Sequence, residues 1–299
     1  MDTPHKTNPS FGTGDADTPQ LEKRMRIELK DIGIPPRPAI LEAIDREMAK
    51  DDPNFAHLAR LIGADVALAA GLIKITNSPY YGFGKKVRTV QEALLVLGLR
   101  VIVKTVAGLA LQNLFKNSPK LERFWDASAK IASLSAWLAQ QLRGKVAVRP
   151  EDAYTFGLFR DCGIPILLIP FPEYESILRQ ANHSATEGFT EIEDRLLSIN
   201  HCVVGAELAE GWYLPAEIVE AIRHHHDPAA YGLATASSAS GELAAIGQLA
   251  EEIVQRATQL GQTAEWSKLG AACLAVLQLD TAEFETLATS AVAARSWEG

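Results

Sequence analysis

Hydrophobic residues recur with helical spacing along almost the whole chain after residue 21. In the segment PAILEAIDREMAK, the residues Ile40, Leu41, Ile44 and Met48 fall on one face of a helix. Pro38 opens this segment, where a proline suits the first helical turn. Alternating patterns typical of strands are short, and helical sequence surrounds them. The pattern therefore predicts an all-α protein with about a dozen helices of ordinary length.

Several helix starts can be placed from capping residues. Asp65 follows a break at Gly63 and is a good N-cap for the helix after it. Three further sites have the spacing of a capping box, in which a hydroxyl or carboxylate side chain stands three positions before a glutamate. They are the pairs Thr89–Glu92, Thr190–Glu193 and Asp280–Glu283. We expect one helix to begin at each of these pairs.

The composition of the chain changes at two places that suggest domain boundaries. Residues 1–20 contain no Val, Ile or Leu and are rich in Pro, Gly, Thr and Asp, which predicts a flexible tail. The stretch FKNSPK, residues 115–120, is typical of a connector between two helical groups. We therefore expect an N-terminal helical bundle over 21–118 and a second bundle over 119–299, packed together as one compact unit.

Charge and composition disfavour several classes of function. The chain is 47% hydrophobic with a net charge of −8, so it can bury a large core and its surface repels nucleic-acid phosphates. It shows no signal peptide and no apolar stretch long enough to span a membrane. We expect a soluble cytoplasmic protein that binds neither nucleic acid nor membrane. The three cysteines, Cys162, Cys202 and Cys273, lack disulfide or metal-site spacing and are expected to be buried, unreactive thiols.

Three consecutive histidines occur in the stretch RHHHDP, residues 223–228. His225 and His226 continue the apolar face of a predicted helix, whereas His224 points elsewhere. Two interpretations stay open for this cluster. The histidines are either metal ligands or a positively charged cap at a helix C-terminus, where the helix dipole favours a cation.

Asp161 and His201 are the other polar residues that need an explanation. Asp161 lies in the apolar stretch FGLFRDCG, where an unpaired carboxylate is unfavourable. Its partner could be a metal, a backbone donor or its neighbour Arg160, although consecutive residues diverge by about 100° on a helix. His201 falls on an apolar helix face, where a lone histidine is more often a satisfied core residue than a ligand.

Several motifs together resemble a known family. FGLFRDCG is similar to the central motif of the HD superfamily of metal-dependent phosphohydrolases, which usually reads GLLHDIG. The stretch from Glu191 through SINHCVVGAELAEGWYLP to IRHHHDP resembles the HDOD family (HD-related output domain). Upstream, IPPRPAILEAI, DVALAAGLIKITNSPYYGF and TVQEALLVLGLRVI follow that family's pattern in order. The resemblance covers roughly residues 25–255. It implies an N-terminal helical bundle packed on a degenerate HD-like helical bundle.

The resemblance also implies which residues would have formed a metal site. The matched ligand positions are Asp161, His201, His225 and His226. The replaced positions are Ala127, Arg160 and Glu251, which stand where the family has a histidine, a histidine and an aspartate. Arginine has no acceptor atom and stays charged, so we expect the remnant to bind a divalent metal weakly at most. We also expect Arg160 to replace the lost metal electrostatically and to stabilise Asp161.

The resemblance favours a non-catalytic signalling module that binds a partner signalling protein or a nucleotide-like small molecule. No receiver, kinase or cyclase segment fits in the sequence, so its input is expected to come from another molecule. The alternative is a residual metal-dependent phosphohydrolase or phosphodiesterase of the HD type that acts on a nucleotide. A third interpretation is a small-molecule sensor that reuses the vacated metal cleft as a pocket. We expect no cofactor.

Two further stretches each have two interpretations. In the loop TNSPYYGFGKK, the residues Asn77, Tyr80 and Tyr81 could contact a ligand or partner, or the two rings could pack on the core. The stretch RVIVKTVAGLALQNLF is hydrophobic on most of its sides. It predicts either a central core helix or part of an oligomer interface.

Overall fold

A computed structural model of the chain describes residues 32–78, 86–115, 121–231, 239–259 and 261–295. Within these residues the regular structure is helical, apart from an isolated bridge between Arg143 and Val146. The predicted all-α class is therefore confirmed. Within the same residues, every helix is too short or too polar to cross a bilayer.

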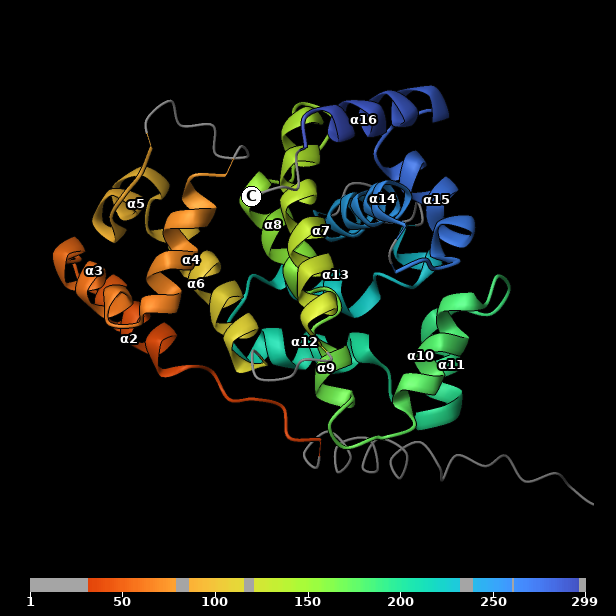
Figure 1. Cartoon of the computed structure of the whole chain (residues 1–299), viewed down its shortest axis with the longest axis horizontal. Coiled ribbons are helices and arrows are strands. Elements are labelled where there is room, and N and C mark those ends of the chain that lie inside the picture. Colours follow the sequence, from red (N-terminus) through yellow and green to blue (C-terminus); the bar gives the residue numbers. More distant parts are fainter. Residues whose placement is uncertain (1–31, 79–85, 116–120, 232–238, 260, 296–299) are drawn as a thin grey trace, which may run out of the picture.

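The helices fall into two groups along the chain (Figure 1). The first group comprises α2 (Ala39–Met48), α3 (Phe55–Gly63), α4 (Val66–Thr76), α5 (Val90–Leu97) and α6 (Leu99–Leu114). The second group comprises α7 (Glu122–Gln141), α8 (Pro150–Phe159), α9 (Gly163–Leu167), α10 (Tyr174–His183), α11 (Phe189–Leu197), α12 (His201–Gly211), α13 (Ala216–His224), the 3-10 helix η2 (Pro228–Tyr231), α14 (Ala239–Thr258), α15 (Glu265–Val276) and α16 (Thr281–Ala293).

Capping residues set several of these helix starts. Asp65 accepts hydrogen bonds from two backbone N–H groups at the start of α4, and Thr89 accepts one at the start of α5. Asp280 and Glu283 form the reciprocal hydrogen bonds of a capping box at α16. The expected starts at these three places are confirmed.

The helix start expected at Thr190 and Glu193 is wrong. α11 begins one residue before Thr190 and uses Glu191 as its capping acid. Glu193 instead turns inward, is fully buried, and accepts hydrogen bonds from Tyr174 and His201. These two donors satisfy the Glu193 carboxylate in the core. Glu191 caps the helix in its place.

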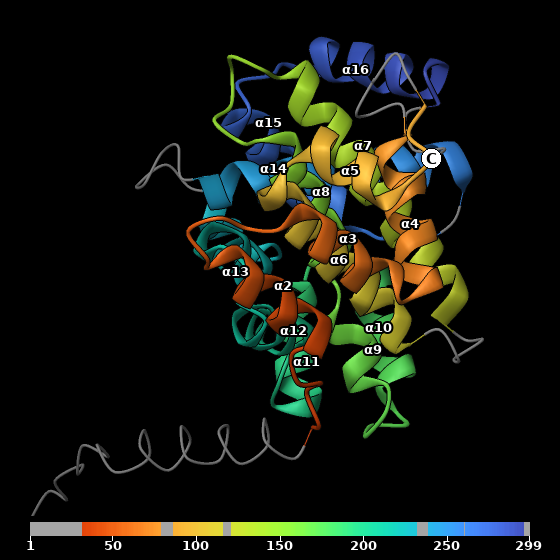
Figure 2. The ribbon, with the colours of Figure 1, turned by 90° about the vertical axis from the view of Figure 1, so that its left-hand side faces the viewer.

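The two groups of helices share one core. Figures 1 and 2 show α2–α6 gathered on one side of the molecule, with α7 and α8 behind them in Figure 2. α6 packs on α8, and α8 packs on α7 and α14. Buried hydrophobic side chains form one continuous cluster from the first group to α16. α6 carries buried residues along its length, so its predicted place in the core is confirmed.

Polar contacts also join the two groups. Lys104 of α6 forms a buried ion pair with Asp152 of α8. Before α2, Arg37 donates to the backbone carbonyl of Trp212 at 3.1 Å, and the Trp212 indole donates to the carbonyl of Pro35 at 3.2 Å. The segment before α2 is thereby attached to the turn between α12 and α13.

Two glycines let α9 approach the start of α12 closely. A Cβ atom on Gly163 would lie 2.1 Å from the carbonyl oxygen of His201, and one on Gly205 would lie 3.2 Å from the Sγ atom of Cys162. A real Cβ cannot approach a carbonyl oxygen so closely, so only glycine allows this crossing at position 163. The crossing places the turn after α8, which carries Asp161, beside the first residue of α12.

Candidate metal centre and the buried arginine beside it

Ligand residues predicted from the sequence converge from three separate segments. Asp161 lies between α8 and α9, His201 opens α12, and His225 follows α13. The Oδ1 atom of Asp161 lies 3.2 Å from His225 Nε2 and 3.5 Å from His201 Nε2. The two Nε2 atoms lie 3.5 Å from each other. The structure therefore brings these three predicted residues into direct contact.

Arg160 lies on the other side of Asp161 and is almost completely buried. Its Nε atom lies 3.3 Å from Asp161 Oδ2, and its Nη2 atom lies 2.9 Å from Glu251 Oε2. Its Nη1 atom donates to the carbonyl oxygen of Gly247 at 3.1 Å. The pairing with Asp161 that helix geometry left open is thus present. Burial opposes ionisation, but Arg160 and the neighbouring histidines hold the pKa of Asp161 well below its usual range.

Glu251, which the resemblance predicts to replace an aspartate, is the second carboxylate bound by Arg160. The side-chain amides of Gln248 and Gln255 also donate to Glu251, each at 3.1 Å. Burial raises the pKa of the Glu251 carboxyl, and Arg160 counteracts part of that rise. The guanidinium thus supplies positive charge between the buried Glu251 and the partly buried Asp161.

Ala127 of α7, which the resemblance predicts to replace a histidine, presents only a methyl group. It lines a cavity of about 350 Å³, together with Asp161, Glu251 and apolar residues that include Ile131 and Val254. The cavity therefore adjoins both carboxylates that contact Arg160, which was not evident from the sequence.

The rings of His201 and His225 are oriented by acceptors outside the cluster. The Nδ1–H of His201 donates to the Glu193 carboxylate at 2.8 Å, and the Tyr174 hydroxyl donates to the same carboxylate. The Nδ1–H of His225 donates to the carbonyl oxygen of Ile222 at 2.8 Å. Both Nε2 atoms are thereby turned toward Asp161. Histidines that ligate metals are commonly held in this way, by a carboxylate or a carbonyl on the second ring nitrogen.

His226 lies beside the cluster with its own acceptor. Its Nδ1–H donates to Glu265 at 2.7 Å, Glu265 pairs with Lys268, and the ring stacks on Phe189 with centroids 4.6 Å apart. Burial and the neighbouring His225 lower the pKa of His226 to about 3, so this ring is neutral near pH 7. His224 is partly exposed and lies 3.3 Å from Glu220, so it points away as predicted.

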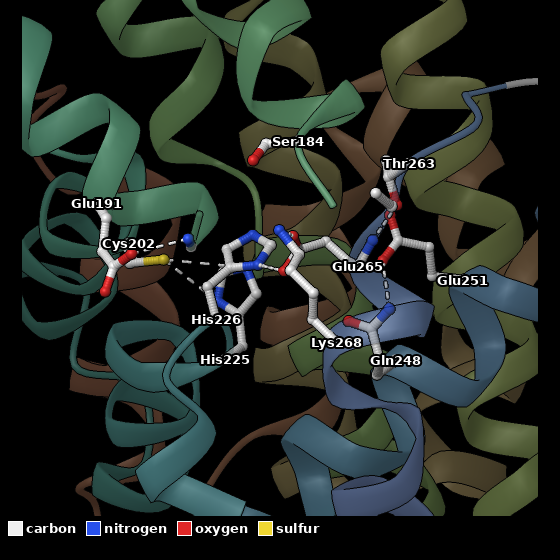
Figure 3. Close-up of polar contacts among 12 residues, drawn as sticks. Ser184, Glu191, Cys202, His225, His226, Gln248, Glu251, Thr263, Glu265 and Lys268 are labelled. Carbon is white, nitrogen blue, oxygen red and sulfur yellow. Dashed lines mark hydrogen bonds and ion pairs between the residues drawn. The ribbon is translucent and has the colours of Figure 1, made fainter. Parts of the chain in front are cut away.

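Cys202 is the member of the cluster that the sequence interpretation missed. Its Sγ atom lies 3.5 Å from His201 Nε2 and 4.0 Å from His225 Nε2. Figure 3 shows Cys202 on one side of His225 and His226, with Glu265 and Lys268 on the other side. Burial opposes ionisation, yet His201 and His225 lower the pKa of this thiol.

The other two cysteines have no such surroundings. All three thiols are buried, as expected. Burial raises the pKa of Cys273 to about 12, and it also raises the pKa of Cys162 above the usual range. Cys202 thus differs from Cys162 and Cys273 by its two histidine neighbours. The signal that could have identified Cys202 is its place next to His201 at the start of a helix.

The donor set does not fit the open metal centre of a hydrolase. A catalytic metal needs convergent ligands and a free position for water. Arg160 offers five N–H donors and no acceptor, and Ala127 offers no donor atom. What remains is compact. His201, Cys202, His225 and His226 each place one potential ligand atom within 4.8 Å of those of the others.

The loop surface proposed around Asn77 is described only in part. The Asn77 amide donates to the carbonyl of Val87 at 2.7 Å and accepts from the N–H of Val87 at 2.8 Å. This side chain therefore ties the end of α4 to the segment before α5. Tyr80 and Tyr81 lie outside the described residues, so the role of this surface stays a prediction.

The fold defines an all-α protein in which a group of five helices packs on an HD-like helical bundle. The family model of the HDOD domain matches residues 34–228. The chain belongs to the HDOD family, as its motifs predicted.

Curated relatives are distant and longer. The chain is 26% identical over 198 residues to an uncharacterized protein of Treponema pallidum, a match that covers 65% of this chain and 38% of that protein. It is 28% identical over 109 residues to the uncharacterized protein YuxH of Bacillus subtilis, covering 36% of this chain and 25% of YuxH. The matches thus span well under half of the length of these relatives.

Solved structures share the fold. An HDOD domain protein of unknown function from Geobacter sulfurreducens has a TM-score of 0.62 at 21% identity, covering 92% of this chain and 94% of that chain. A candidate phosphohydrolase from Shewanella amazonensis has a TM-score of 0.65 at 19% identity, covering 90% and 94%. A candidate signal transduction protein from Marinobacter aquaeolei has a TM-score of 0.60 at 21% identity, covering 95% and 67%. At these identities the likeness establishes the fold alone.

Proposed function

We propose that this chain is a regulatory module that acts by binding another molecule and does not hydrolyse phosphoesters. The observation that carries this proposal is the buried guanidinium of Arg160 between Asp161 and Glu251. In a working centre of the HD type, a metal would stand against Asp161 and activate water. A fixed cation at this place balances the carboxylates but can neither bind water as a Lewis acid nor accept a proton.

The cavity beside Ala127 supports a binding role. Its lining combines apolar side chains with three carboxylates and two cations, which are Asp126, Asp161, Glu251, Arg123 and Lys130. A cavity of about 350 Å³ is in the range of small-molecule sites. We propose that a partner signalling protein or a nucleotide-like small molecule is recognised on this side of the HD-like bundle. The name of the Marinobacter aquaeolei protein, a candidate signal transduction protein, agrees with this role.

Hydrolysis is tested by measuring turnover of bis(p-nitrophenyl) phosphate by the purified chain with Mg²⁺, Mn²⁺ or Zn²⁺. The proposal expects no turnover above that of the variant His225→Ala. His224→Ala is the matched control, because this partly exposed histidine lies next to His225 but outside the cluster. Turnover that His225→Ala abolishes and His224→Ala retains would overturn the proposal.

Binding is tested separately by thermal unfolding with a panel of mononucleotides. The sensor interpretation expects at least one nucleotide to raise the melting temperature of the wild type. It also expects the variant Ala127→Phe, which fills the cavity, to lose that shift. Ala129→Phe, on the same helix but lining a different cavity, is the control. If no nucleotide shifts the wild type, the small-ligand form of the proposal fails and the protein-partner form is left.

A residual phosphohydrolase is the second candidate, because Asp161, His201 and His225 still converge with their rings oriented as in metal sites. The name of the Shewanella amazonensis protein, a candidate phosphohydrolase, points the same way. The turnover measurement above decides between the two candidates.

A further inference from the structure

A second cavity lies where the two groups of helices meet. This junction cavity is lined by α2 and α6 of the first group, by the residue that precedes α8, and by the turn between α12 and α13. Its volume of about 270 Å³ is just below the usual range of small-molecule sites, which begins at about 300 Å³. It is separate from the cavity beside Ala127, because no described residue lines both.

Positive side chains dominate the charged lining of the junction cavity. Four of the described lining residues are cations and one is a carboxylate, namely Arg37, Arg100, Lys104, Arg149 and Asp45. The whole chain, by contrast, has a net charge of −8. Cations gathered in a hollow of an acidic protein attract anions to that place. The junction cavity therefore has the charge of an anion site.

Three of the four cations are held in place by carboxylates. Arg37 pairs with Asp45, and Lys104 and Arg149 both pair with Asp152. Arg149 is half exposed, and its hydrogen bond to Asp152 uses Nε, which leaves its two terminal nitrogens for a ligand. Groups that are positioned before a ligand arrives lose less entropy when it binds.

Arg100 supplies the positive charge that is left over. Glu151 lies 3.7 Å from Arg149 Nε, so three carboxylates accompany the other three cations. Arg100 forms no ion pair within the described part of the chain, and its side chain is exposed. Arg100 and Lys104 are four residues apart on α6 and therefore lie on the same face of this helix.

The rest of the lining is mainly apolar. It includes Leu41, Val103, Leu214 and Pro215. A bare inorganic anion would leave this apolar surface uncovered, whereas a ligand with a charged head and an apolar body would contact both kinds of lining. Arginine also suits phosphate, because its planar guanidinium can donate to two phosphate oxygens at once.

We propose that the junction cavity binds a small organic phosphate. Arg100 and Arg149 hold the phosphate group, and the apolar body of the ligand lies against α6 and the turn between α12 and α13. Arg100 belongs to the first group of helices and Arg149 precedes α8 of the second. The bound phosphate thus bridges the two groups and stabilises their packing, since a ligand that binds only the folded chain raises its stability.

Calorimetric titration of the full chain with three related probes tests the proposal. Phenyl phosphate, benzoate and phenol share one ring and differ in the charged group. Phenyl phosphate is expected to bind more tightly than benzoate, and phenol is expected to give no binding heat. Absence of phenyl phosphate binding, or equal binding of phenol, would overturn the anion site. Tighter binding of benzoate would overturn the assignment to phosphate.

Arginine variants then locate the bound phosphate. Arg100→Gln is expected to weaken phenyl phosphate binding by about 10-fold or more, the effect of losing one hydrogen bond to a charged group. Because Arg100 is exposed and unpaired within the described residues, this variant should melt at the wild-type temperature. Arg123→Gln is the matched control, since it removes another exposed arginine, which lines the cavity beside Ala127. Equal affinity in the two variants would show that the phosphate does not bind in the junction cavity.

This inference does not depend on the proposed function. Phosphate binding between the two groups of helices agrees with either result of the turnover measurement. Failure to bind phenyl phosphate overturns only the inference, and phosphodiester turnover that depends on His225 overturns only the proposed function.

Discussion

The two sides of Asp161 solve the same electrostatic problem in different ways. On one side, the guanidinium of Arg160 neutralises Asp161 and Glu251 with a charge that is part of the chain. On the other side, His201, His225 and Cys202 present donor atoms to one another, and the two histidine rings are oriented by acceptors outside the cluster. The difference teaches that one carboxylate can be held in two ways in the same core. The arginine side is a fixed ion-pair network, whereas on the other side two oriented histidine rings contact Asp161.

The largest effect is expected when Arg160 is removed. The variant Arg160→Met leaves the buried Glu251 and the partly buried Asp161 without their cation. Removing one partner of a buried ion pair lowers the free energy of unfolding by about 3–5 kcal/mol. Urea unfolding followed by circular dichroism measures the loss. Arg195→Met is the control, because its ion pair with Glu187 is exposed and such pairs contribute about 1 kcal/mol or less.

A matched double variant checks the cause of that loss. Glu251→Gln removes one of the two negative charges, so it should restore part of the stability that Arg160→Met loses. If Arg160→Met unfolds at the same urea concentration as the wild type, Arg160 does not replace a metal electrostatically and the comparison between the two sides fails.

The next effect concerns the crossing that joins the two sides. In Gly163→Ala the new Cβ would lie 2.1 Å from the His201 carbonyl oxygen, so α9 and α12 must move apart. Overpacking of this kind lowers the free energy of unfolding by about 1–3 kcal/mol, to be measured by thermal unfolding. Gly211→Ala is the control, since its Cβ has nothing within 4 Å. A Gly163→Ala variant as stable as this control would mean that the close crossing is not needed to position Asp161.

A third prediction tests how firmly the histidine side is held. Tyr174→Phe removes the hydroxyl that donates to Glu193, the carboxylate that orients His201. Leaving a buried acceptor without this donor lowers the free energy of unfolding by about 1–3 kcal/mol. Urea unfolding measures the loss, with Tyr213→Phe as the exposed control. An unchanged midpoint for Tyr174→Phe would show that His201 is oriented without help from the buried tyrosine.

Much of the fold followed from the sequence because local rules govern it. Apolar spacing predicted the helices, and caps such as Asp65 and Asp280 marked where they begin. The rule failed at Glu193, where Tyr174 and His201 from two other helices made the core the better place for a carboxylate. Local spacing describes exposed helix ends well, but it contains no information about such tertiary donors.

Only those site residues that belong to a family motif could be predicted from the sequence. Asp161, His201 and His225 were expected together because the family resemblance places them, and their contacts are present. Cys202 was missed, because the cysteines were judged only by their spacing from one another and not by their histidine neighbours. Its sulfur contacts His225, which follows α13 and lies more than 20 residues away in the chain.

The smallest change in stability is expected at Ala127, the position at which the resemblance predicts a lost histidine ligand. Ala127→His places an imidazole in a cavity of about 350 Å³, and we expect a change of about 0.5 kcal/mol or less. Because Arg160 still occupies the space between Asp161 and Glu251, this variant should not hydrolyse bis(p-nitrophenyl) phosphate with Mn²⁺. The double variant Ala127→His with Arg160→His restores both histidine positions and is the one in which turnover should first be sought. Ala129→His, on the same helix but lining a different cavity, is the control. If Ala127→His alone gains turnover that the control lacks, then the missing imidazole, and not the buried arginine, is what prevents hydrolysis on this side of Asp161.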